Sequence, residues 1–164
     1  MIRGRFLRSG DDTSAVFALR EQVFVDELGC SEAFARDALD DMAIYALVFD
    51  ELDVPSGAGR LAIDDDRFMV GAVCVRGESR GQGLGDLIMR MLLLRVQEMD
   101  APSVYAKAQP DVQPFFQRYG FKLIEPTVDG RSLMRALKDE IDIEGACHKG
   151  ADGCAGCDKE CGRS

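Results

Sequence analysis

A glycine-rich turn between a buried strand and a helix constrains the fold of this chain more than any other feature. Residues 68–75 are mostly apolar and predict a strand, and the turn Arg80-Gly81-Gln82-Gly83-Leu84-Gly85 follows them. Apolar residues then recur at helical spacing, and a second predicted strand covers residues 103–108. This order predicts a strand–helix–strand unit and therefore an α/β (or α+β) fold.

The turn has the properties of an anion site. Glycines permit positive φ and let a ligand approach the backbone, and the following helix adds N–H groups and its positive dipole end. A P-loop would need Lys and Ser or Thr where Asp86 and Leu87 stand, and the spacing of Gly81, Gly83 and Gly85 is not that of a dinucleotide fingerprint. The turn predicts a pyrophosphate site of another kind, and a turn that merely connects strand to helix remains the alternative.

The remaining pattern alternates short strands with short helices. Further strands are expected at residues 2–8, 44–51, 60–64, 121–124 and 132–137, and a turn at residues 53–59. Helices are expected from Thr13 to about Gly29, from Ser31 to about Leu39, and after Pro110. The core pattern stops near Glu144, so we expect a domain over residues 1–144 and a cysteine-rich tail over residues 145–164.

Composition and charge narrow the class of protein. The chain has 164 residues, 46% of them hydrophobic, which suits one globular domain. Its 20 basic and 29 acidic residues give a net charge of −9 without a basic stripe, so we expect no nucleic-acid partner and a cationic acceptor. No apolar run approaches the roughly 20 residues that span a bilayer, and the first residues do not form a signal peptide. We expect a cytoplasmic protein without a membrane partner.

Several motifs in order resemble one family. The spacing of Arg80, Gly83 and Gly85 is similar to the signature Q/R-x-x-G-x-G/A that follows a strand in the GNAT acyl-CoA N-acyltransferases, and residues 108–121 resemble that family's closing helix with its terminal Gly-Phe. Residues 20–27 and 129–131 resemble the ElaA-type branch of the family. The resemblance covers residues 2–137.

The resemblance implies a fold, an activity and a cosubstrate. The fold would be a mixed, twisted sheet with splayed central strands, flanked by about four helices. The activity would be transfer of an acyl group, expected to be acetyl, from acetyl-CoA to an amine of a small molecule or a protein by direct attack. A backbone N–H of the fourth strand would polarise the thioester. The cofactor-binding residues it implies are Val73, Val75, Arg80, Gly81, Gln82, Gly83, Leu84, Gly85, Asp86, Gln109 and Phe116.

The catalytic positions depart from the family pattern. Phe116 stands where many members have a Tyr acid, and Gly71 stands near the position of the common Glu base. Tyr119 is a candidate acid or a packing residue, and Glu27, Asp40 and Asp41 are candidate bases or surface carboxylates. Because of these departures, a non-catalytic CoA-binding or metal-sensing or redox-sensing protein is the alternative function. We also expect acids, including residues 64–66, to attract the amine.

The tail carries a cluster of soft metal ligands. Cys147, His148, Cys154, Cys157 and Cys161 lie within the last 18 residues, near glycines that permit tight turns. Such a set is typical of a zinc site or an iron–sulfur cluster, although the spacing matches neither standard pattern. A reduced tail that binds nothing is the alternative. The sequence does not predict the oligomeric state.

Overall fold

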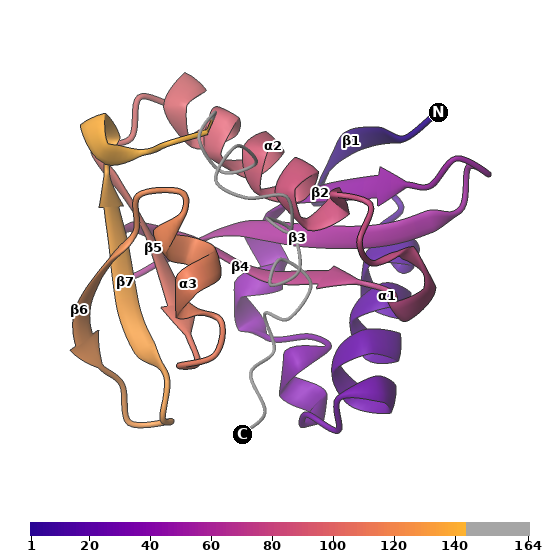
Figure 1. Cartoon of the computed structure of the whole chain (residues 1–164), viewed down its shortest axis with the longest axis horizontal. Helices are drawn as coiled ribbons and strands as arrows, with labels where there is room; N and C mark the ends of the chain where they lie inside the picture. Colours follow the sequence, from indigo (N-terminus) through magenta and orange to yellow (C-terminus); the bar gives the residue numbers. More distant parts are fainter. Residues whose placement is uncertain (144–164) are drawn as a thin grey trace.

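The computed structural model describes residues 1–143, which form a seven-stranded sheet with helices on both faces (Figure 1). The strand order is β1-β2-β3-β4-β5-β7-β6. Strands β4 and β5 run parallel, and the other neighbouring strands run antiparallel. The predicted boundary at Glu144 and the tail lie outside the described residues.

The strands agree closely with the sequence pattern. They are β1 (Arg3–Arg8), β2 (Ile44–Phe49), β3 (Pro55–Asp64), β4 (Arg67–Val75), β5 (Ser103–Ala108), β6 (Lys122–Pro126) and β7 (Ser132–Leu137). Helix α2 (Leu84–Glu98) connects β4 to β5, so the predicted strand–helix–strand unit and the fold class are confirmed.

The shorter helices lie mainly between β1 and β2. They are α1 (Ser14–Arg20), η1 (Glu21–Glu27), η2 (Glu32–Phe34), η3 (Ala38–Met42), η4 (Gly77–Ser79), α3 (Gln113–Gln117) and η5 (Lys138–Glu140). The single helix expected from Thr13 to Gly29 is α-helical only at first and continues as the π-helix η1, at whose end the Leu28 N–H donates to the Val23 carbonyl at 3.0 Å.

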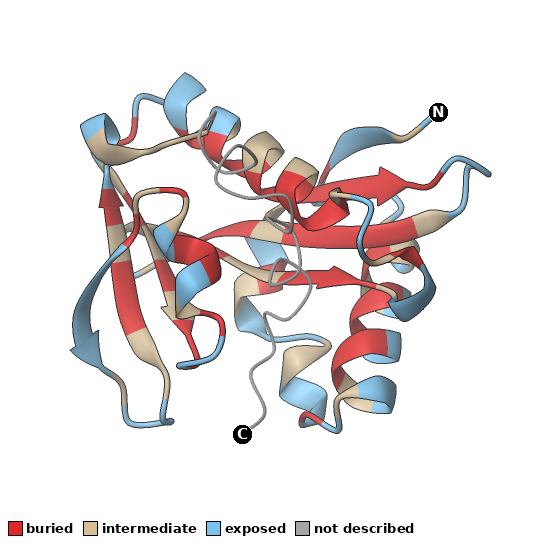
Figure 2. Ribbon diagram, viewed as in Figure 1, coloured by how far each residue is buried: buried red, intermediate tan, exposed pale blue. Residues whose placement is uncertain are grey.

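Two apolar cores form, one on each face of the sheet (Figure 2). Helices α2 and α3 pack on one face, where Ile88, Leu92 and Phe116 are fully buried. Helices α1 and η1 cover the other face around Leu19, Phe24 and other buried side chains. The candidate site lies in the sheet between these two helical layers, at the point where β4 meets β5.

The prediction of a turn at residues 53–59 is wrong from Pro55 onward. Strand β3 begins at Pro55 and runs through Gly57 and Gly59. A Cβ on Gly59 would lie 2.4 Å from Ile88 Cγ2, so the helix occupies the space that a side chain would need. These glycines serve close packing of α2 on the sheet rather than a turn.

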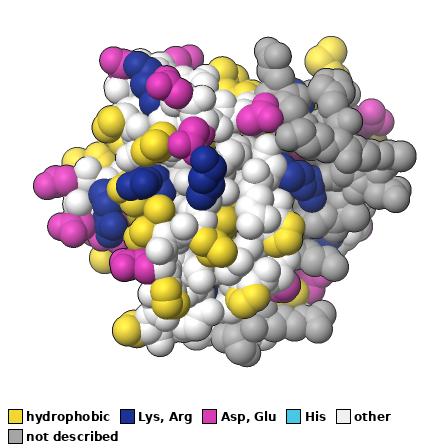
Figure 3. Space-filling view, turned by 60° about the vertical axis from the view of Figure 1, so that its left-hand side comes forward, with side chains coloured by type: hydrophobic (Ala, Val, Ile, Leu, Met, Phe, Trp, Pro, Cys, Tyr) yellow, Lys and Arg dark blue, Asp and Glu magenta, His cyan; other side chains and the backbone are white. Residues whose placement is uncertain are grey.

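Strand β6 forms the far edge of the sheet. All five of its residues are exposed, including Leu123 and Ile124. The face in Figure 3 carries hydrophobic, basic and acidic side chains intermixed, with no continuous basic stripe. Over residues 1–143, none of the helices combines the length and apolarity that crossing a lipid bilayer requires.

Candidate active site

The central strands separate at one position. Met69 of β4 pairs with Tyr105 of β5, and this is the one pair the two strands form within the described chain. Just beyond it, the β3–β4 register shifts between Ala58 and Arg60, and Ala72 has a φ of 50°. A positive φ on a residue other than glycine is strained and marks a bulge that redirects the backbone. From Ala72 onward, the edge of β4 that faces β5 is separated from that strand.

The glycine-rich turn lies at the end of that edge. Gly81 and Gly83 have φ values of 81° and 77°, in the left-handed region that favours glycine. A Cβ on either residue would meet no atom within 4 Å, so the space above the turn is open. Gly83 is the N-cap of the 15-residue helix α2, whose first N–H groups lack intrahelical acceptors and suit a pyrophosphate.

Arg80 is held from two sides. Its Nε donates to the Val75 carbonyl at 3.1 Å, and its two terminal nitrogens donate to both carboxylate oxygens of Glu27 at 2.5 and 2.7 Å. The guanidinium is therefore engaged with protein groups at the base of the turn. In this arrangement Arg80 fixes the turn, and the backbone of residues 81–86 stays the predicted contact for a ligand.

A pocket lies on the η3 side of the bulge, and we call it the acceptor pocket. Its apolar and backbone lining comes from Leu39, Met69, Val70, Gly71 and Ala72. Its charged lining comes from Asp37, Arg60, Asp64, Lys107 and Arg131. The pocket and the glycine-rich turn thus lie toward opposite ends of the separated edge of β4.

The comparisons with known proteins agree with this geometry. A family model described as an acetyltransferase (GNAT) domain matches residues 14–142. The chain belongs to the GNAT acetyltransferase family. It is an acyl-CoA-dependent N-acyltransferase with acetyl-CoA as cosubstrate, as the resemblance implied, and the non-catalytic alternative is not favoured.

This GNAT acetyltransferase has relatives of the same kind. It is 29% identical over 108 residues, or 66% of this chain and 76% of the relative, to an uncharacterized N-acetyltransferase of Bacillus subtilis, YjcF. Its fold matches an acyl-CoA N-acyltransferase from Pseudomonas aeruginosa with a TM-score of 0.73 and 24% identity, covering 83% of this chain and 99% of that one. Escherichia coli ElaA matches with a TM-score of 0.71, 24% identity and the same coverage.

The other residues expected at the cofactor site differ in how far they are exposed. Gly81 and Gln82 are exposed, whereas Leu84, Gly85 and Asp86 are buried in the first turn of α2. Val73 and Val75 bury their side chains in the core, so they would offer only backbone groups to the pantetheine arm. The Gln109 carbonyl accepts from the N–H groups of Val112 and Gln113, and Phe116 packs edge-on against Phe121. Their roles toward CoA remain predictions.

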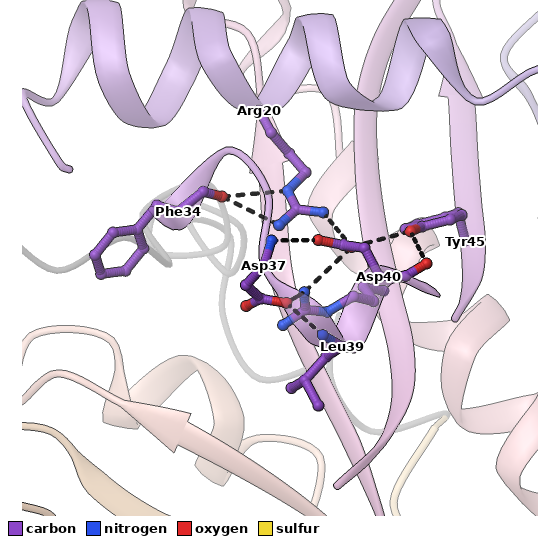
Figure 4. Close-up of polar contacts among 7 residues, drawn as sticks. Arg20, Phe34, Asp37, Leu39, Asp40 and Tyr45 are labelled. Atoms are coloured by element: carbon purple, nitrogen blue, oxygen red, sulfur yellow. Dashed lines mark hydrogen bonds and ion pairs between the residues drawn. The ribbon is translucent and has the colours of Figure 1, made fainter. Parts of the chain in front are cut away.

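Asp40 is the centre of a buried polar network (Figure 4). Its carboxylate accepts from Arg20 at 2.7 Å and from the Tyr45 hydroxyl at 2.9 Å, and it forms an ion pair with Arg60 at 3.2 Å. Burial alone would raise the pKa of Asp40, but hydrogen bonds from Arg20 and the Asp37 N–H, together with both arginine charges, lower it to about 2. Burial and the Asp40 charge raise the pKa of Tyr45.

These contacts do not bring the candidate bases to the bulge. Asp40 is fully engaged and too weakly basic to take a proton from an amine near neutral pH. Glu27 binds Arg80 at the turn, and the exposed Asp41 lines a different pocket with Arg36 and Tyr45. None of the three lines the acceptor pocket, and their role as general base stays a prediction.

Tyr119 occupies the interior, away from the acceptor pocket. Its side chain is fully buried, its ring packs edge-on against Phe115, and its hydroxyl donates to Asp86 Oδ1 at 2.7 Å. Asp86 also forms an ion pair with Arg90 at 2.8 Å, which offsets a negative charge near the predicted pyrophosphate site. The geometry favours the packing alternative, and the acid role of Tyr119 stays a prediction.

The sequence reasoning did not select the three cations of the pocket as site residues. Arg60, Lys107 and Arg131 come from β3, β5 and the turn before β7, and only Arg131 belongs to a motif, the segment 129–131 that resembles the ElaA-type branch. The metal-ligand candidates Cys147, His148, Cys154, Cys157 and Cys161 lie outside the described residues. Within residues 1–143, no three His, Cys, Asp or Glu side chains are grouped so that they could hold a metal ion.

Proposed function

We propose that the acceptor pocket binds an amine whose nitrogen attacks the thioester of acetyl-CoA beside the bulge at Ala72. The observation that carries the proposal is the separation of β4 from β5 after Met69 and Tyr105, with a phosphate-type turn at one end and a pocket at the other. The pantetheine arm would extend along β4 past Val73 and Val75, and the pyrophosphate would rest on the first turn of α2.

The reaction is a direct transfer. The amine nitrogen forms a bond to the carbonyl carbon, the carbon–sulfur bond breaks, and CoA leaves as its thiolate. A backbone N–H of the bulge would stabilise the developing oxyanion. A thiol with a pKa of about 8.5 is a tolerable leaving group near neutral pH, so a protein acid is not essential.

The proton on the acceptor needs a separate route. Position 71 is glycine, so the strand offers no carboxylate where the resemblance places the family base. We therefore propose that the ammonium group loses one proton to solvent base before attack. After attack the nitrogen loses a second proton to solvent, and solvent protonates the departing thiolate. The value of kcat/KM should then rise with pH until the pKa of the free acceptor amine, and acceptors with different amine pKa values should give correspondingly shifted profiles.

The cofactor part of the proposal is tested at Gly83. A Gly83→Asp variant places a carboxylate where the pyrophosphate would bind, yet Asp is a favourable N-cap and tolerates left-handed backbone, so helix α2 should persist. Gly10→Asp is the matched control, because Gly10 also has a positive φ of 102° and no atom within 4 Å of its added Cβ.

For both variants, calorimetry measures the affinity for acetyl-CoA, and a thiol-release assay measures turnover. We expect Gly83→Asp to weaken acetyl-CoA binding at least about tenfold, roughly 1.4 kcal/mol, and Gly10→Asp to bind as the parent chain does. Equal affinity in both variants would refute the placement of the pyrophosphate. Tight binding without turnover on a broad amine panel would refute the proposed transfer.

The tail and the location of the protein are separate proposals. A zinc or iron–sulfur site at the tail ligands is supported only by the ligand cluster in the sequence, and a cytoplasmic location only by the use of acetyl-CoA, an intracellular metabolite, as cosubstrate. Metal analysis and absorbance spectra of the anaerobically purified chain, compared with a variant whose four tail cysteines are Ser, test the former. Equal metal content in both would reject it.

A further inference from the structure

A lysine lies next to the glycine that replaces the family base. Strand register pairs Gly71 with Arg60 on β3, and it pairs Met69 with Tyr105 on β5. Two residues further along both parallel strands, Gly71 and Lys107 are neighbours where the strands begin to separate. Lys107 alternates with the buried Ala106 and Ala108, so its side chain lies on the opposite face of β5 from theirs, and it lines the acceptor pocket.

The other two cations of the pocket already have acidic partners. Arg60 forms ion pairs with Asp37 at 2.7 Å and Asp40 at 3.2 Å, and Arg131 forms one with Asp129 at 2.6 Å. Lys107 forms no ion pair with any residue of the described chain. Among residues 1–143, Lys107 is therefore the one cation of the pocket without an acidic partner, and it lies beside the proposed reacting position.

Asp64, the remaining acidic residue that lines the pocket, is too distant to neutralise the charge of Lys107. Asp64 ends β3 and pairs in register with Arg67, whereas Lys107 is level with Gly71. Four residues of extended strand separate these levels, which is roughly 13 Å. The pocket thus has a cationic end beside the bulge and an acidic end near the β3–β4 turn.

We propose that Lys107 binds a carboxylate of the acceptor, so that the acceptor class is amino acids, with the amine and the carboxylate on one small molecule. This inference rests on the proposed function of the acceptor pocket. A carboxylate on a half-buried lysine forms charge-assisted hydrogen bonds. A diamine or polyamine would instead place a second cation beside Lys107, which is unfavourable despite the net charge of −9.

The cofactor's own phosphates are not the partner of Lys107. The pyrophosphate site is at residues 81–86, beyond the carboxyl end of β4, and Gly71 lies four residues before that end at Val75. At about 3.3 Å per residue, Lys107 is level with the thioester rather than with the pyrophosphate. The anion it binds must therefore come from the acceptor.

The test compares acids with their matched amides. Acetyl-CoA-dependent thiol release is measured for the twenty amino acids, β-alanine and longer ω-amino acids, each beside its carboxamide, and for diamines. We expect at least one acid to exceed its amide about tenfold or more in kcat/KM. Lys107→Ala should remove that preference mainly through KM, Lys107→Arg should restore part of it, and Lys107→Glu should shift preference toward diamines.

Controls distinguish a failure of the proposed acceptor class from a failure of the proposed function. Lys122→Ala is the matched control, because Lys122 is 72% exposed and pairs with Glu140 on the far edge of the sheet. Acetyl-CoA affinity and the melting temperature should be unchanged in every Lys107 variant. If acids and their carboxamides react equally, or if Lys107→Ala keeps the preference for the acid, the proposed acceptor class is overturned while the proposed function stays intact. No thiol release with any amine would overturn the proposed function itself.

Discussion

Glu27 and Arg80, 53 residues apart in the chain, form a two-point ion pair that joins the end of η1 to the glycine-rich turn. The same arginine donates to the Val75 carbonyl at the end of β4. The Arg80 side chain therefore connects both η1 and the end of β4 to the base of the predicted pyrophosphate site. Two residues selected from the sequence for different roles, a base and a cofactor ligand, act on each other.

Replacing Glu27 with Gln should weaken acetyl-CoA binding without stopping the reaction. The pair is partly exposed, with side-chain exposures of 27% for Arg80 and 37% for Glu27, so losing its charge should alter affinity only severalfold, about 1 kcal/mol or less. The pH profile of kcat should keep its shape. If Glu27 were the general base, kcat would instead fall by about 100-fold or more and lose its pH dependence.

Asp40 should make the folded state sensitive to acid. Its pKa falls from 3.8 to about 2 on folding, so the unfolded chain takes up a proton more readily than the folded one. The stabilisation is therefore complete above about pH 4 and is lost as pH falls through about 2, and it amounts to about 2 kcal/mol. Urea unfolding between pH 2 and pH 6 should show this loss in the parent chain.

The variant Asp40→Asn should flatten that pH dependence. At neutral pH it should also lower the free energy of unfolding by about 3–5 kcal/mol, because Arg20, whose side chain is 1% exposed, would keep a buried charge without its partner. Asp111→Asn, at an exposed position, should leave both quantities unchanged. An Asp40→Asn curve parallel to that of the parent would contradict the role of this network.

Adding a methyl group at Gly59 should destabilise the fold through α2. The new Cβ would lie 2.4 Å from Ile88 Cγ2 and 3.0 Å from Leu92 Cδ1, so Gly59→Ala should cost about 1–3 kcal/mol by overpacking. Gly4→Ala is the control, because its nearest contact is the flexible end of Met91. Thermal unfolding should rank Gly59→Ala well below Gly4→Ala, and equal melting temperatures would disprove the packing argument.

Removing the hydroxyl of Tyr119 should affect stability more than turnover. Tyr119→Phe deletes the buried bond to Asp86, and we expect a loss of about 1–3 kcal/mol in the free energy of unfolding. Because the hydroxyl proton is directed to Asp86 rather than toward the acceptor pocket, kcat at a permissive temperature should stay within a few-fold of the parent value. A drop of 100-fold with unchanged stability would identify Tyr119 as the acid.

Much of this architecture could be predicted from local sequence patterns. These patterns gave the succession of strands along the chain, the helix after the glycine-rich turn and the phosphate-type geometry of Gly81 and Gly83. Each of these features depends on neighbours within a few residues. The same holds for Ser103–Ala108 and Ser132–Leu137, whose observed bounds match the predicted ones. Hydrophobic periodicity and backbone freedom are properties that a short segment has on its own.

Other features depended on contacts between distant segments. Gly59 pairs with Ala46 in the sheet, and Ile88 of α2 fills the space that a side chain there would need, but nothing near Gly59 in the sequence reveals that helix. Glu27 and Asp40 looked like available carboxylates, but Arg80, Arg20 and Arg60 neutralise them only after folding. Lys107 lines the same pocket as Gly71 because β4 and β5 run parallel and separate after a single pair. Pairing, burial and charge compensation across the fold are set by three-dimensional neighbours, so only the tertiary structure decided which residues form the pocket.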